Sequence, residues 1–214
     1  MLAEVEAELG HYDEALSFNA QALDLSNQVL GPLAAITGQV LLARGMILTR
    51  HGQFDEARQA IDQGLSILHK RFAPGDPHFP LAGEIRGELE LAQGDLAAAQ
   101  RDFTDALDFH SKKYGNKGLH VATSMMHVAD VLDAKGDHTA AETRYREAIQ
   151  AARAKWTGDS TTVAHALFGL GRSLAAEGKR ADAQAPLRES LEIRRRLLPA
   201  GHPDIAAAEA AARL

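Results

Sequence analysis

The stretch "GHYDEA", Gly10 to Ala15, returns as "GQFDEA" at Gly52 to Ala57. The two copies stand 42 residues apart, and the same spacing continues along the whole chain. The glycines that share this spacing are Gly10, Gly52, Gly94, Gly136 and Gly178. The alanines that follow them five residues later are Ala15, Ala57, Ala99, Ala141 and Ala183. A constant period of this length predicts a solenoid of stacked structural repeats.

Each glycine lies between two segments with helical spacing. After Gly52, the residues Ala57, Ile61, Gly64 and Leu65 fall at the i, i+4, i+7 and i+8 positions of one helix face. Before each glycine, the residue seven positions upstream is small, which allows two helix backbones to approach closely. Those small residues are Ala3, Gly45, Gly87, Ala129 and Gly171. The repeated unit is therefore predicted to be a helical hairpin whose turn glycine has a positive φ.

Composition agrees with an all-α chain and excludes several functions. Hydrophobic residues make up 45% of the chain but aromatic residues only 5%, so most apolar residues are strong helix formers such as Ala and Leu. The net charge of -6, without a long basic run, argues against binding to nucleic acid. Without an apolar run of about 18 residues or an export leader, we expect no membrane association and a cytoplasmic location. The absence of cysteine excludes disulfides, thiolate zinc sites and a cysteine nucleophile.

The two ends of the chain depart from the regular repeat. The Asp76-Pro77 pair predicts the start of a first helix, and Ser160 has the same place two repeats later. In this register the first helix of the first unit would begin before Met1, so about half of it is missing. The sequence is then either a piece of a longer protein or an incomplete repeat with an open apolar face. Residues 204–214 predict a short capping helix.

The sequence resembles the tetratricopeptide repeat family. The resemblance rests on the Gly-x-aromatic-x-x-Ala phrase, on the small residue in the preceding helix and on the small residue and Leu in the following helix. The 42-residue period and "LLPAGHPDIA" at Leu197 to Ala206 resemble the long repeats of kinesin light chains and many bacterial signalling proteins. We therefore expect one domain over residues 1–214, an all-α, right-handed superhelical solenoid of tandem helical hairpins with a C-terminal capping helix.

The resemblance also implies where a ligand would lie, because first helices line the concave face of tetratricopeptide arrays. The residues 13, 10, 6 and 3 positions before each turn glycine form one stripe on these helices, distinct from the core stripe. The predicted peptide-binding groove is Gln39, Leu42, Met46, Glu84, Glu88, Thr123, Met126, Asp130, Asp133, His165, Phe168 and Arg172. The exposed Met and Phe of such a groove would suit adaptable peptide binding.

Two interpretations of the stripe stay open. In the first, Leu42, Met46, Met126 and Phe168 are apolar anchors and the acids select a protein or peptide segment with an apolar anchor and basic flanks. In the second, the acids keep a helix face solvated while the Met and Phe side chains pack into neighbours. A further alternative gives the chain an assembly or regulatory role in a larger signalling protein, with self-association through the open first repeat.

We expect no enzymatic activity, no cofactor and no metal. The phrase "GLGRSL", Gly169 to Leu174, lies inside a predicted helix rather than after a strand, so it does not predict a dinucleotide loop. No two histidines have the spacing of a helical zinc site. The nearest arrangement is His127 with Asp130 and His165, which would be the centre of an enzyme if one existed.

Overall fold

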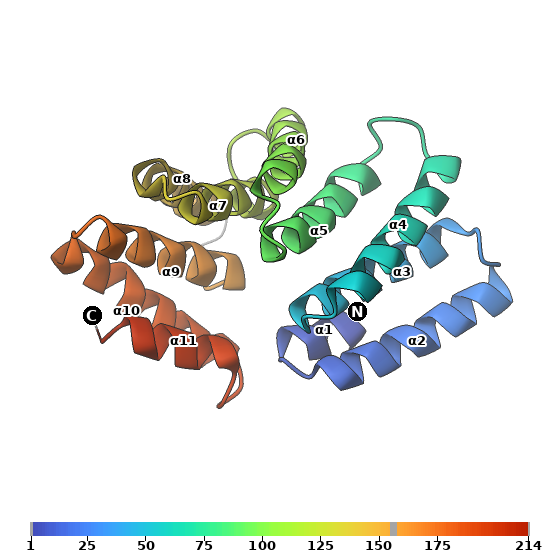
Figure 1. Ribbon diagram of the computed structural model, residues 1–214, viewed down its shortest axis with the longest axis horizontal. Helices are drawn as coiled ribbons and strands as arrows, with labels where there is room; N and C mark the ends of the chain where they lie inside the picture. Colours follow the sequence, from blue (N-terminus) through green and yellow to red (C-terminus); the bar gives the residue numbers. More distant parts are fainter. Residues whose placement is uncertain (1, 155–157, 214) are drawn as a thin grey trace. The chain divides into compact units, whose positions relative to one another are not determined.

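The computed structural model describes residues 2–154 and 158–213, and these residues form helices without strands (Figure 1). Over residues 2–92 and again over residues 119–211, each helix packs on the next one along the chain. Their bounds are α1 Leu2–Glu8, α2 Tyr12–Val29, α3 Ala35–Arg50, α4 Phe54–Arg71, α5 His78–Ala92, α6 Leu96–Tyr114, α7 Leu119–Ala134, α8 His138–Arg153, α9 Thr161–Ala176, α10 Arg180–Leu197 and α11 Pro203–Ala211. The all-α prediction and the hairpin order are confirmed.

The five turn glycines share one backbone conformation. Gly10 has a φ of 82°, and Gly52, Gly94, Gly136 and Gly178 each have a φ of 81°. An L-amino acid with a side chain rarely adopts this region, whereas glycine adopts it without a steric penalty. At Gly52, the next amide, that of Gln53, donates to the carbonyl oxygen of Leu48 at 2.9 Å and so closes the helix end. The predicted positive φ is confirmed at every repeat.

The chain divides into two compact units, residues Met1–Asp102 and Phe103–Leu214, and each is described by itself. Met1 and Leu214, the outermost residues of the predicted single domain, lie outside the described part of the chain. The prediction of one domain over 1–214 stays a prediction.

Close helix contact in each unit depends on glycine in the first helix of a hairpin. In unit 1, a Cβ added to Gly45 would lie 2.4 Å from Cγ1 of Ile61 on α4. In unit 2, a Cβ added to Gly171 would lie 2.4 Å from Cγ of Leu187 on α10. Real Cβ atoms do not come this close to a carbon, so the small residue seven positions before the turn is required by packing.

Each unit has its own apolar core between first and second helices. In unit 1, Leu48, Ile61 and Leu68 are buried against Leu89 of α5, and Ile47 packs against Ala7 and Ala15 of the preceding hairpin. In unit 2 the core of buried side chains is Val121, Ala122, Met125, Met126, Ala129, Ala141, Tyr145, Ala148, Ala151, Ala152, Val163, Ala164, Ala166, Leu167, Leu170, Leu174, Ala183, Leu187 and Ile193.

The predicted cap is confirmed at α9, where the Ser160 hydroxyl accepts the amide of Val163 at 3.2 Å. At α5 the prediction is wrong by one residue, because Pro77 is the N-cap and the helix begins at His78, whose amide donates to the Asp76 carboxylate at 3.0 Å. The predicted capping segment forms α11, which packs on α10. There the Arg194 guanidinium donates to the carbonyl oxygen of Asp204 at 2.7 Å. Among the described residues, no helix has both the length and the apolar character that a membrane crossing requires.

Candidate functional site

The predicted groove residues fall into two sets, one in each unit, and all lie on first helices of hairpins. In unit 1 they lie on α3 and α5, and in unit 2 on α7 and α9. The set of unit 1 is Gln39, Leu42, Met46, Glu84 and Glu88. The set of unit 2 is Thr123, Met126, Asp130, Asp133, His165, Phe168 and Arg172. These two sets are called stripe 1 and stripe 2 below.

Most side chains of stripe 1 contact neighbouring helices of unit 1. Leu42 is only 3% exposed and lies against Gly64 of α4, where an added Cβ would meet its Cγ at 3.1 Å. Met46 is half-buried and packs between the cores of the first two hairpins. Gln39 is exposed and its side-chain amide contacts His78 at the start of α5. Stripe 1 therefore offers little exposed apolar surface for an anchor.

The acids of stripe 1 are largely withdrawn from solvent. Glu84 is buried, and Glu88 is half-buried beside Arg50. Burial acts to lower the pKa of Arg50, but Glu88 and Glu8 together raise it, and Glu8 accepts the Arg50 guanidinium at 2.5 Å. Arg50 thus offsets negative charge at this end of α3, which reduces the field available to a basic ligand.

Stripe 2 contains a connected polar network centred on two aspartates of α7. The Tyr145 hydroxyl donates to Oδ1 of Asp130 at 2.7 Å, and Nε2 of His165 lies 3.1 Å from the same oxygen. The Tyr145 ring reaches this point because it lies against Gly169, where an added Cβ would be 2.3 Å from its Cζ. One residue from each of α7, α8 and α9 therefore meets at Asp130.

Asp133, almost one turn further along α7, has a similar set of donors. The Ser173 hydroxyl donates to Oδ1 of Asp133 at 2.8 Å, and Nδ1 of His138 lies 2.8 Å from the same atom. The Arg172 guanidinium is 3.9 Å from Oδ2 of Asp133, beyond hydrogen-bond distance. In both aspartates these hydrogen bonds converge on Oδ1, and among the described residues of unit 2 the group nearest to Oδ2 is the Arg172 guanidinium at 3.9 Å from Asp133.

The network favours the charged forms of Asp130 and His165. Burial alone would raise the pKa of Asp130, but the charge and hydrogen bond of His165 lower it below its ordinary value of 3.8. The same pairing with Asp130 raises the pKa of His165 above 6.5, against the effect of burial. Burial and the nearby Asp130 carboxylate raise the pKa of the Tyr145 hydroxyl, so it stays a donor.

The aromatic residue of stripe 2 stands next to this network. The Phe168 ring lies 4.6 Å from the Arg194 guanidinium and 5.9 Å from that of Arg172, within the range of cation–π contacts. Phe168 is half-buried, while the Arg172 side chain is 60% exposed. Thr123 reaches across to Thr162 with 3.3 Å between their hydroxyl oxygens.

The expectation that four apolar side chains stand exposed in the groove is wrong for two of them. Leu42 is 3% exposed and Met126 is 6% exposed, and both belong to the cores of their units. Their side chains lean toward the neighbouring helices, as the second interpretation of the stripe proposed. Met46 and Phe168 remain at the surface in part, so Phe168 is the apolar group that lies beside the aspartates.

The arrangement of His127, Asp130 and His165, considered above as the centre of an enzyme, is only partly assembled. His165 meets Asp130, whereas the His127 ring packs on Phe103 with 4.6 Å between the ring centroids. Among residues 2–154 and 158–213, no three His, Asp or Glu side chains converge in a way that could hold a metal ion.

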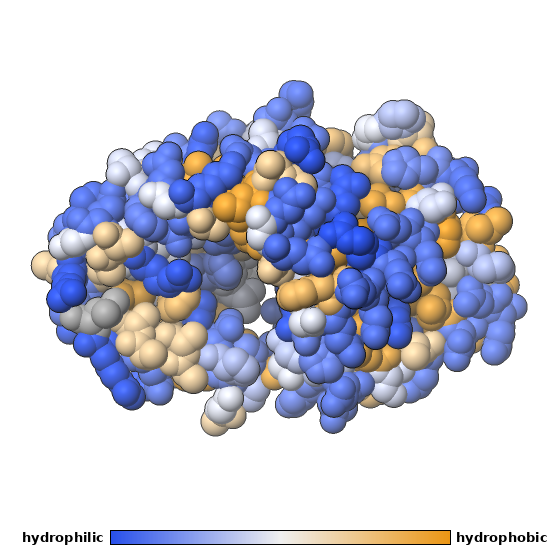
Figure 2. All heavy atoms as spheres, viewed as in Figure 1, coloured by the Kyte–Doolittle hydropathy of each residue, from blue (hydrophilic) through white to orange (hydrophobic). Residues whose placement is uncertain are grey.

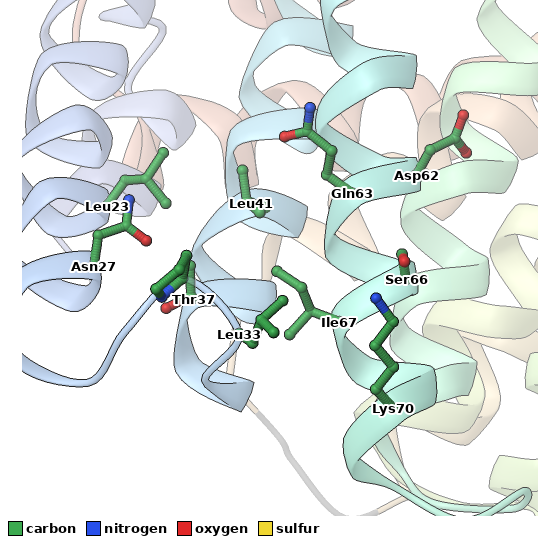
Figure 3. A pocket seen from close by; sticks show the side chains of 11 residues that line it. Leu23, Asn27, Leu33, Thr37, Leu41, Asp62, Gln63, Ser66, Ile67 and Lys70 are labelled. Carbon is green, nitrogen blue, oxygen red and sulfur yellow. The ribbon is translucent and has the colours of Figure 1, made fainter.

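Hollows in each unit lie beside the second helices rather than along the stripes. Figure 3 shows one of those in unit 1, a cavity of about 530 Å³ with Leu23 and Asn27 of α2 on one side and Gln63 and Lys70 of α4 on the other. A hollow of about 1100 Å³ in unit 2 lies between α8 and α10, next to Arg144 and Pro186. None of the predicted groove residues lines either hollow.

Sequence reasoning missed the donors that fix the aspartates. Tyr145 occupies a core position held by Ile61, Phe103 and Leu187 in other repeats, so its hydroxyl was the signal that a buried acceptor lay nearby. Ser173 stands at the position of Ile47, Leu89 and Val131, where a polar side chain is equally out of pattern. His138 and Arg194 gave no comparable signal.

Comparisons with known proteins agree with the repeat fold. Two models of the tetratricopeptide repeat match the chain, one over residues 1–70 and 82–154 and the other over residues 163–204. BtubC (BKLC) from P. vanneervenii has a similar structure, with a TM-score of 0.68 and 17% identity over 92% of this chain and 78% of that one.

Two further solved structures are similar. A candidate kinesin light chain from P. anserina with nearly identical repeats gives a TM-score of 0.65 and 18% identity over 91% of this chain and 92% of that one. A Rap protein complexed with Competence and Sporulation Factor gives a TM-score of 0.66 and 15% identity over 99% of this chain and 60% of that one. No curated protein sequence matches the chain. On the strength of the repeat models, the chain belongs to the tetratricopeptide repeat family.

Proposed function

We propose that stripe 2 binds a protein segment in which a Lys or Arg stands beside an apolar residue. The protein acts as an interaction scaffold, and the site consists of Asp130 and Asp133 on α7 with Phe168 on α9. The observation that carries the proposal is that the two oxygens of each carboxylate have different surroundings. Oδ1 of each aspartate is held by donors of unit 2, and Oδ2 is left for a ligand.

The fixed orientation of the Asp130 carboxylate lowers the entropy cost of binding a ligand. A carboxylate that is already fixed by Tyr145 and His165 loses little side-chain entropy when a ligand cation binds, which is the advantage of a preorganised site. The lowered pKa of Asp130 keeps it negative over the whole physiological range. Asp130 and Asp133 lie at i and i+3 on one helix face, so one guanidinium or ammonium can lie between them.

The apolar contact would come from the exposed part of Phe168. Its ring is already in contact with Arg194, so a ligand side chain would pack on the exposed edge and on the stem of Arg172. Arg172 also repels a cation placed beyond Asp133, which limits the number of basic residues that stripe 2 accepts. Stripe 1, where Leu42 and Glu84 are buried, is not part of this proposed site.

The related structures support a binding role without identifying the ligand here. The Rap protein was solved with Competence and Sporulation Factor, and YrrB, with a TM-score of 0.51 and 16% identity, is described as having an unusual peptide-binding site. Those descriptions concern the two other proteins.

The test uses two labelled peptides with glycine–serine spacers, one with a leucine between two lysines and one with a leucine between two glutamates. We expect the lysine peptide to bind better at low salt, and the variant Asp130→Asn, Asp133→Asn to weaken its binding by about two- to tenfold. Asp105→Asn, an exposed acid of α6, is the matched control and should leave binding unchanged. Equal binding of both peptides, or equal loss in the control, would refute the proposal.

A further inference from the structure

Each aspartate of stripe 2 has a histidine among its partners. Nε2 of His165 on α9 lies 3.1 Å from Oδ1 of Asp130, and Nδ1 of His138 on α8 lies 2.8 Å from Oδ1 of Asp133. Both contacts are made within unit 2, and His138 and His165 are called the two histidines below. Two His–Asp pairs therefore stand at the place proposed for the ligand cation.

The two histidines are open to water, whereas the aspartates behind them are less so. The His165 side chain is 47% exposed and that of Asp130 is 16% exposed. The His138 side chain is 32% exposed and that of Asp133 is 13% exposed. Each imidazole can therefore exchange a proton with solvent. Its charge interacts more strongly with the carboxylate than it would in bulk water, because less water screens the pair.

A change of protonation does not require either histidine to move. Imidazole is the side chain whose charge changes near physiological pH. A neutral imidazole keeps one N–H group, and in the tautomer with that hydrogen on Nε2 of His165 or on Nδ1 of His138 it donates to the same carboxylate oxygen. Loss of the other proton leaves this contact in place and removes the positive charge. Protonation thus changes the charge at stripe 2 while the geometry is kept.

The charges that face His165 come from three helices. Asp130 of α7 is the main one, and it favours the protonated ring. Asp204 of α11 acts in the same direction, whereas Arg194 of α10 and burial act against it. The pKa of His165 is raised on balance, so this ring takes up a proton at a pH where an unpaired histidine is mostly neutral.

The other groups around the aspartates are neutral, permanently charged or buried. The Tyr145 and Ser173 hydroxyls, which each donate to one of the aspartates, are neutral donors. Arg172 is a permanent cation 3.9 Å from Oδ2 of Asp133. His127, on the same helix as the aspartates, is a further ionisable group but is buried. Of these partners, the two histidines are the exposed ones that titrate near neutral pH.

The sign of the charge at stripe 2 depends on the two histidines. When both are neutral, the two aspartates face one cation, Arg172, and negative charge prevails. When both are protonated, three cations face the two aspartates and positive charge prevails. Figure 2 shows a surface on which hydrophilic side chains prevail and hydrophobic ones form smaller patches, and stripe 2 has one partly exposed aromatic ring, Phe168. Charge should therefore contribute much of the selectivity.

We propose that protonation of the two histidines prevents stripe 2 from binding a basic segment, and that stripe 2 binds this segment when both rings are neutral. The inference rests on the proposed function of stripe 2. A ligand lysine and a protonated histidine compete for the same carboxylate charge, so each disfavours the other by the same factor. The protein therefore releases such a partner as the pH falls.

The experiment measures the binding of the lysine–leucine peptide, with blocked termini, between about pH 5.5 and 8.5 at constant low salt. We expect the affinity to rise with pH by about two- to fivefold for each histidine, and that of the glutamate peptide to fall. His138→Gln and His165→Gln keep an uncharged N–H donor, so each should remove part of the rise and the double variant should remove all of it. His69→Gln in unit 1 is the control and should keep the full rise.

Proton NMR of His165 gives a second measure that a merely structural histidine would not change. Addition of the lysine peptide should lower the pKa of His165, because binding and protonation are linked. A lysine peptide that binds better than the glutamate peptide, but equally at every pH, would overturn this inference and leave the proposed function standing. A rise that persists in the double variant would overturn it as well. If the two peptides bind alike at every pH, the proposed function fails and this inference fails with it.

Discussion

Stripe 1 and stripe 2 occupy the same register of the repeat but use their side chains differently. In stripe 1, Leu42 has become part of the core and Glu84 is buried. In stripe 2, Asp130 and Asp133 stay at the surface in part and are held by donors from two helices, α8 and α9. The difference shows that a repeat position sets the direction of a side chain, whereas the neighbours on adjacent helices decide whether it is available to a ligand.

The largest effect should come from removing Tyr145, the residue that distinguishes stripe 2. Tyr145→Ala should lower the free energy of unfolding by about 3–5 kcal/mol, and Ile61→Ala, at the same position in unit 1, by about 2–5 kcal/mol. Tyr145→Phe keeps the ring but removes the donor to a charged acceptor, so we expect a loss of about 1–3 kcal/mol. Urea unfolding measures these losses. A Tyr145→Phe variant as stable as the original would show that its hydrogen bond to Asp130 contributes nothing.

A smaller effect, opposite in sign between the units, should follow from adding one methyl group to a glycine. Gly169→Ala should lower stability by about 1–3 kcal/mol, because the new Cβ would be 2.3 Å from the Tyr145 ring. Gly83→Ala should raise it by about 0.5–1 kcal/mol, because the nearest atom is 3.8 Å away and alanine favours the helix. Thermal unfolding of both variants checks the signs, and a destabilised Gly83→Ala would contradict the packing described for α5.

The smallest effect should be a pH dependence that belongs to stripe 2. Because Asp130 raises the pKa of His165 in the folded chain, the stabilisation is complete below 6.5 and is lost as the pH rises through the raised value. Asp204 adds to this shift and Arg194 opposes it. His165 is partly exposed, so the amplitude should stay below about 1 kcal/mol.

His165→Gln should flatten the stability curve above pH 6.5, and His69→Gln in unit 1 is the matched control. Stability measured by urea unfolding across this range tests both variants. An unchanged slope in His165→Gln would place the pH dependence elsewhere.

The backbone of this fold could be predicted from the sequence because the same turn, packing and capping residues recur in the repeats. Gly52 and Gly136 require a positive φ, Gly45 and Gly171 require close packing, and Ser160 caps a helix. These features depend on residues near one another in the chain or at a constant spacing. They therefore needed no knowledge of the three-dimensional structure.

The candidate site was less predictable, because exposure depends on how adjacent helices cross. Met126 and Phe168 have the same place on the helical wheel, yet Met126 is buried and Phe168 is not. A helical wheel gives the direction of side chains around one helix, but it does not give the crossing angle between that helix and its neighbour. The hydrogen bond between Tyr145 and Asp130 likewise joins residues from two helices, and only the side-chain geometry of unit 2 brings them together.

The uniform φ of 81° to 82° at the five turns also has a consequence for how such a gene can change. A crossover between two of the glycine codons adds or removes a whole number of 42-residue blocks and leaves an identical turn at the junction. Lengthening by recombination is thus sterically neutral at the joint, whereas an insertion of another size inside a helix turns the residues that follow in that helix onto other faces. Variation in related genes should therefore appear as steps of one block.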